Sequence, residues 1–251
     1  MIMSLCRIIF PSRFSLPERP PTQMKTSELS VSGQQKERPS VGLYNLEVRD
    51  MKLSCQSHYL EDYLLELDEV DYSHPLIRNK VNDLFACSFN EIETIKVAFE
   101  YVRDKIAHSF DIQSSRVTCK ASEVLYCEEG ICYAKSNLLA AILRSKGIPI
   151  GFCYQRLTKG DTPDTGYCIH ALNAVYLKTL DRWIRLDARG NKGDVTAQFS
   201  IDEEKLAFPI RQKYEEEDYS IIYTEPNANT ITALRQSSDC NMLFHNLPTQ
   251  L

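Results

Sequence analysis

The 251-residue sequence lacks a hydrophobic run near the roughly 20 residues that a membrane-spanning helix needs. It also lacks an excess of basic residues, because 29 Lys and Arg stand against 34 Asp and Glu and give a net charge of −5. Neither a nucleic-acid partner nor a membrane partner is therefore expected. Hydrophobic residues make up 43% of the chain and charged residues 25%, as in a globular protein that buries a sizeable core.

The nine cysteines lack the pairing that a structural zinc site shows, since no C-x-x-C occurs. An odd number in a chain of this length is also not typical of a secreted disulfide scaffold. We expect a reducing, cytoplasmic location in which most of these thiols are small buried hydrophobic side chains. One of them needs a separate explanation, given below.

Residues 1–48 differ from the rest of the chain in being rich in proline and serine and poor in periodic apolar residues. A secretory signal would place a basic residue before its apolar core, whereas Arg7 interrupts the only mildly apolar stretch here. We predict that 1–48 is a disordered tail or an over-extended gene start. Residues 49–251 are then predicted to form a single domain with its core at about 90–190.

The first half of that domain carries helical signals. Pro75 fits the first turn of one helix, and Asn90 with Glu93 three residues later is typical of a capping box on the next. One or two turns of helix are predicted over 120–127. A further helix is predicted from Cys132 to Lys146, with Gly147 as its C-cap.

The second half carries strand signals. Strands are predicted over 148–157, 167–177 and 182–187, the last two joined by the polar turn 178–181. Helices that precede an antiparallel sheet indicate an α+β fold. Two further predictions are a solvated acidic face at 215–218 and a final helix over 229–245.

Cys132 is the first candidate for chemistry. At a helix start, the unpaired backbone N–H groups and the helix dipole stabilise a thiolate, and the apolar residues that follow would anchor the helix in the core. The alternative is a buried structural thiol, which this local pattern does not exclude.

His170 and Asp187 supply a candidate base and its partner. If the turn uses the four residues 178–181, then Leu172 lies opposite Asp187, and His170 and Asp187 share one face of the sheet a diagonal step apart. A slip of one residue would place them on opposite faces. An imidazole held by a carboxylate is kept in the right tautomer to act as a base, so a thiol and this pair together suit cysteine acyl transfer.

The region around these three residues matches a known pattern in several blocks. The blocks are residues 97–104, 130–132, 138–144, 147–149 and 183–187, together with His170. They resemble the transglutaminase-like superfamily of papain-type cysteine enzymes over about residues 90–190, and 153–157 with 187–192 resemble a bacterial subgroup known only as transglutaminase-domain proteins. Ala171 and Leu172 depart from the glycine and the aromatic residue frequent there, which concerns the shape of the acyl pocket rather than a catalytic group.

The resemblance implies a papain-like α+β core, with N-terminal helices and the nucleophile at a helix start packed on an antiparallel sheet. It also implies that Cys132 is the nucleophile, His170 the base and Asp187 its orienting partner. Such an enzyme acts on amide bonds of proteins or peptides through a thioester, by hydrolysis (peptidase or deamidase) or by acyl transfer to an amine, and needs no cofactor.

Some alternatives stay open at this point. The oxyanion could be bound by the backbone N–H of Cys132 together with Gln155 or Asn173. The domain could also be a catalytically silent interaction module, because a fold does not dictate a function. A metal site built from Cys132, His170 and Asp187 is disfavoured by their wide separation in the sequence. The substrate and the oligomeric state do not follow from the sequence.

Overall fold

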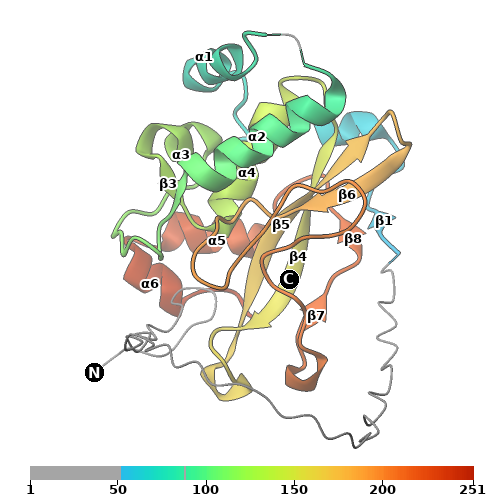
Figure 1. The fold of residues 1–251 in the computed structure, drawn as a ribbon. Coiled ribbons are helices and arrows are strands. Elements are labelled where there is room, and N and C mark those ends of the chain that lie inside the picture. Colours follow the sequence, from blue (N-terminus) through green and yellow to red (C-terminus); the bar gives the residue numbers. More distant parts are fainter. Residues whose placement is uncertain (1–51, 88) are drawn as a thin grey trace, which may run out of the picture. The chain divides into compact units, whose positions relative to one another are not determined.

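The computed structural model describes residues 52–87 and 89–251 (Figure 1). The segment 1–48, predicted to be a tail, lies outside these residues. The elements in chain order, with η for 3-10 helices, are β1 (Ser54–Cys55), η1 (Leu60–Leu64), α1 (Pro75–Leu84), α2 (Glu91–Lys105), β2 (Ala107–His108), α3 (Ala121–Cys127), β3 (Glu129–Gly130), α4 (Cys132–Arg144), β4 (Ile150–Thr158), η2 (Pro163–Thr165), β5 (Tyr167–Leu177), β6 (Arg182–Leu186), η3 (Gln212–Tyr214), β7 (Glu217–Asp218), β8 (Ile221–Ile222), α5 (Ala228–Gln236) and α6 (Cys240–His245).

Four strands form the main antiparallel sheet, in the order β6-β5-β4-β7. The predicted turn at 178–181 is confirmed, because Leu177 pairs with Arg182. β4 pairs along its whole length with β5, from Tyr167 to Val175, whereas β6 pairs only with the second half of β5 and ends at Leu186. Two short parallel pairs, β1 with β8 and β2 with β3, complete the strands of the described residues. Helices precede this sheet along the chain, so the predicted α+β class is confirmed.

The helices of the first half gather on one side of the sheet (Figure 1). The His74 side chain accepts a hydrogen bond from the Leu76 N–H at the start of α1, and the predicted capping box of Asn90 and Glu93 opens α2. α4 is the central helix: all 13 of its residues are buried, and it packs against α2, α3, β4 and β5. Across the described part of the chain, the helices are too short or too polar to cross a membrane.

The last third of the chain departs from the sequence predictions. The single helix predicted over 229–245 is instead two helices, α5 and α6, and the Asp239 side chain caps the second of them. The solvated acidic face predicted at 215–218 is wrong in part, because two of its residues form β7 and Glu216 is buried in an ion pair with Arg211. Arg211 lies on the other side of η3 from Glu216, and an acidic run by itself does not indicate that the loop brings the two together.

Candidate active site

Cys132 is the first residue of α4, and Ile131 alone separates it from β3. Its thiol is free and its side chain is only 5% exposed. A Cβ at Gly130 would come within 3.0 Å of Thr118 Oγ1 and 3.1 Å of Ala134 Cβ, so a larger residue there would push against the start of the helix. The glycine therefore lets the chain enter α4 closely packed, with Cys132 at the positive end of the helix dipole.

His170 and Asp187 meet inside the protein. The Nε2 atom of His170 lies 2.8 Å from Oδ2 of Asp187, and both side chains are fully buried. The strand register that predicted this proximity is the one observed. The backbone N–H groups of Arg189 and Ala207 also donate to Asp187, each at 3.1 Å. These bonds fix the carboxylate, and the carboxylate in turn fixes the ring.

The charges of this pair reinforce one another. Burial by itself lowers the pKa of His170, but the negative charges of Asp187 and Cys132 outweigh it and raise that pKa to about 10. Burial opposes ionisation of Asp187 as well, yet the charge and hydrogen bond of His170 and two backbone N–H groups lower its pKa. Since Asp187 occupies Nε2, the other ring nitrogen, Nδ1, is left for the sulfur. The arrangement favours a protonated imidazolium at His170, with Cys132 as its neighbour.

The two predicted oxyanion donors lie in different surroundings. Gln155 pairs directly opposite His170 in the sheet and is buried, with its Nε2 atom 3.5 Å from Asp218. Asn173 faces the other side of β5, where its amide donates to the backbone carbonyls of Ser136 and Gly151 at 3.3 and 3.2 Å. The structure thus brings Gln155 next to the base, whereas the Asn173 amide ties α4 to the sheet.

Comparison with known proteins relates this chain to a family. Residues 78–188 match the model of the transglutaminase-like superfamily. The chain carries a domain of the transglutaminase-like superfamily. No curated protein matches the chain significantly.

Three solved structures are similar to this transglutaminase-like chain at low identity. One is a candidate cysteine protease from Cytophaga hutchinsonii (15% identity, TM-score 0.43, covering 53% of this chain and 43% of that one). Another is a candidate protease from Parabacteroides distasonis (17%, 0.32, covering 50% and 25%). The third is described as a TGase (14%, 0.38, covering 81% and 54%). The chain spans from a quarter to about half of the length of these proteins.

Buried charged residues that the sequence did not predict surround the transglutaminase-like site. Arg189, two residues after Asp187, forms a buried ion pair with Asp111 at 2.5 Å. Lys135 lies one turn after Cys132 and is completely buried, and its ammonium donates to the Ile106 carbonyl at 2.5 Å. Burial is the main reason why the pKa of Lys135 falls to about 7. Lys135 offered one sequence signal, a charged residue in the first turn of a helix whose later turns are largely apolar.

His108 was also missed, because an isolated histidine is usually structural or solvated. It lies in β2, whose partner strand β3 leads directly into Cys132. Its ring is 4% exposed and borders a cavity of about 340 Å³ that Asp111, Gly190 and Lys192 also line. The pairing of β2 with β3 joins segments 22 residues apart and left no pattern in the sequence.

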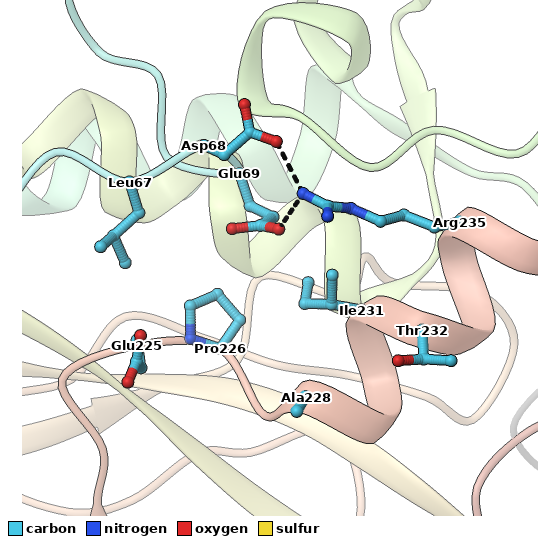
Figure 2. Close-up of a pocket in the computed structure, with 9 residues that line it drawn as sticks. All are labelled: Leu67, Asp68, Glu69, Glu225, Pro226, Ala228, Ile231, Thr232 and Arg235. Atoms are coloured by element: carbon cyan, nitrogen blue, oxygen red, sulfur yellow. Dashed lines mark hydrogen bonds and ion pairs between the residues drawn. The ribbon is translucent and has the colours of Figure 1, made fainter.

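A larger groove of about 460 Å³ lies between α5 and the segment that precedes α1, and none of the three proposed catalytic residues lines it (Figure 2). Arg235 reaches between Asp68 and Glu69 there, at 2.6 and 2.5 Å. These charges satisfy one another, which leaves little to attract a charged ligand. Within residues 52–87 and 89–251, no three His, Cys, Asp or Glu side chains converge as metal ligands would.

Proposed function

We propose that this domain is a cysteine enzyme that acts on amide bonds of proteins or peptides, with Cys132 as nucleophile, His170 as acid and base, and Asp187 as the residue that orients His170. One observation carries the proposal: a buried histidine, hydrogen-bonded to a buried carboxylate and with a raised pKa, lies beside a cysteine at a helix start. Membership of the transglutaminase-like superfamily supports an enzyme of this kind.

The reaction proceeds in two halves. The thiolate of Cys132 attacks the amide carbonyl carbon, and the π electrons of the carbonyl move onto its oxygen. When this intermediate collapses, the C–N bond breaks and His170 gives its proton to the departing amine, which leaves a thioester on Cys132. Water or a second amine then attacks the thioester and returns a proton to His170 as the C–S bond breaks. Water gives hydrolysis, and an amine gives cross-linking.

A second function has one observation in its favour. Cys132, His170 and Asp187 are 5%, 0% and 1% exposed, so a substrate reaches the sulfur only if covering groups move. A transglutaminase-like domain that stays closed in this way would serve as a catalytically silent interaction module. The same burial, once the site has opened and closed on a substrate, would strengthen the electrostatics of the pair and exclude water.

The test uses casein as a general protein substrate. Three products are measured with and without dansylcadaverine: ammonia for deamidation, new N-termini for peptide hydrolysis, and bound dansyl groups for acyl transfer. We expect Cys132→Ala to abolish whichever product the wild-type enzyme forms. The matched control is Cys87→Ala, which removes an exposed thiol elsewhere.

Undiminished turnover in the Cys132→Ala variant would contradict the assignment. If the wild-type enzyme forms none of the three products, the interaction module becomes the better account.

A further inference from the structure

His108 lies beside the segment that delivers the nucleophile. In the parallel pair of β2 and β3, His108 is the partner of Gly130, two residues before Cys132. The Ser109 N–H donates to the Gly130 carbonyl at 3.3 Å and holds the two strands in this register. The backbone of His108 therefore lies beside Gly130, the residue two positions before the start of α4.

The imidazole of His108 has unmet hydrogen-bonding capacity. It is 4% exposed, and among the described residues neither Nδ1 nor Nε2 has a hydrogen-bond partner. A neutral imidazole carries one N–H donor and one acceptor nitrogen, and buried polar groups of this kind are normally paired. The ring also borders the cavity of about 340 Å³, which leaves room on that side of His108, although Cys132, His170 and Asp187 do not line it.

The surroundings of His108 suit an oxygen that gains negative charge. Burial holds the pKa of His108 well below its ordinary value, and the positive charges of Arg189, Lys135 and His170 act in the same direction. The ring is therefore neutral, with a single N–H to donate, in a region of positive potential. An uncharged donor of this kind can bind an oxyanion, while His170 remains the group that gives a proton to the departing amine.

We propose that His108 is a further catalytic residue of the amide chemistry, whose N–H donates to the oxyanion formed when Cys132 attacks the carbonyl. This inference rests on the proposed function of Cys132. The backbone N–H of Cys132 supplies the second donor. As the S–C bond forms, the carbonyl electron pair moves onto oxygen and both donors hold it; when the electron pair returns, the bond to the leaving group breaks.

Two small reagents separate this role from a structural one. p-Nitrophenyl acetate acylates a thiolate through a tetrahedral oxyanion and releases p-nitrophenolate, whereas iodoacetamide alkylates it at a saturated carbon without forming one. In His108→Phe we expect acetylation of Cys132 to slow about 100- to 1000-fold, with alkylation of Cys132 within about twofold of wild type. His108→Gln keeps an N–H donor at this position and is expected to retain most of the acetylation rate.

The unchanged alkylation rate also shows that the variants are folded around an intact thiolate. The inference is overturned if acetylation is undiminished in His108→Phe, or if both reactions slow together. Wild-type enzyme acetylated at other cysteines but not at Cys132 would overturn the proposed function and this inference with it. Undiminished acetylation in His108→Phe, with Cys132 as the acetylated residue in the wild type, overturns the inference alone.

Discussion

Replacing Asp187 by asparagine removes one negative charge and two acceptor lone pairs from the centre of the site. In the wild-type protein, Oδ2 accepts from His170 and from the Ala207 N–H, and Oδ1 accepts from the Arg189 N–H. Asparagine has a single carbonyl oxygen. With that oxygen in the Oδ2 position, its NH2 group faces the Arg189 N–H, donor against donor. The flipped orientation is worse, because the NH2 group then faces both His170 and Ala207.

The expected loss of stability follows from the number of hydrogen bonds that asparagine cannot form. The better orientation leaves one buried backbone donor unpaired, which costs about 1–3 kcal/mol of the free energy of unfolding. The loss of the Asp187 charge also removes the largest contribution that raises the His170 pKa to about 10. Each unit by which that pKa falls weakens the imidazolium–thiolate pair about tenfold. We therefore expect iodoacetamide to label Cys132 at pH 6 at least about tenfold more slowly than in the wild-type protein.

Two assays on Asp187→Asn check these numbers. Urea unfolding is followed by the fluorescence of Trp183, the only tryptophan in the chain, which packs 4.9 Å from the ring of Tyr63. Labelling of Cys132 is followed by mass spectrometry. Asp164→Asn, on an exposed residue of η2, serves as the control. A variant with wild-type labelling at pH 6 would refute the argument that Asp187 sustains the ion pair.

Two further predictions concern buried charges. Lys135→Met should remove a dependence of stability on pH, because burial lowers the pKa of Lys135 to about 7 whereas in the unfolded chain it is near 10.4. The stability of the wild-type protein relative to the variant should therefore rise between about pH 7 and pH 10. A difference in urea midpoints that does not change with pH would contradict this. Arg185→Leu should lower the free energy of unfolding by about 2 kcal/mol, because Arg185 is 4% exposed and forms ion pairs with both Glu204 and Asp218 at 2.6 Å. An unchanged urea midpoint would show that these ion pairs contribute no net stability.

The sequence predicted the parts of this structure that depend on local rules. The capping box at Asn90 and the glycine after α4 mark helix ends by the residues themselves. The proximity of His170 to Asp187 depended only on the length of one turn, because a four-residue connection fixes the register of both strands. These inferences needed no knowledge of distant contacts.

The rest of the site depends on long-range packing. Arg189 and Asp111 are 78 residues apart, and no periodicity in either segment predicts that they meet. The alternation of polar and apolar residues that identifies a strand face is missing from β5, which is buried on both sides. The sequence could not show which face of β5 meets α4, so it could not decide between Gln155 and Asn173.

Burial makes several of the other thiols hard to ionise, which favours selective alkylation of Cys132. Burial raises the pKa of Cys119 and Cys240 to about 11 and that of Cys153 to about 12, so these three thiols should stay unreactive near neutral pH. The thiol of Cys87 is exposed and remains accessible to the reagent.

The most direct test of the account is therefore the order in which limiting iodoacetamide labels the cysteines at pH 6, mapped by mass spectrometry in the wild-type protein and in His170→Ala. If His170 and Cys132 form a reactive ion pair, Cys132 is labelled first in the wild-type protein and loses that priority in the variant. Labelling of Cys132 that is slower than that of the exposed Cys87, or that is equally fast without the imidazole, would contradict it.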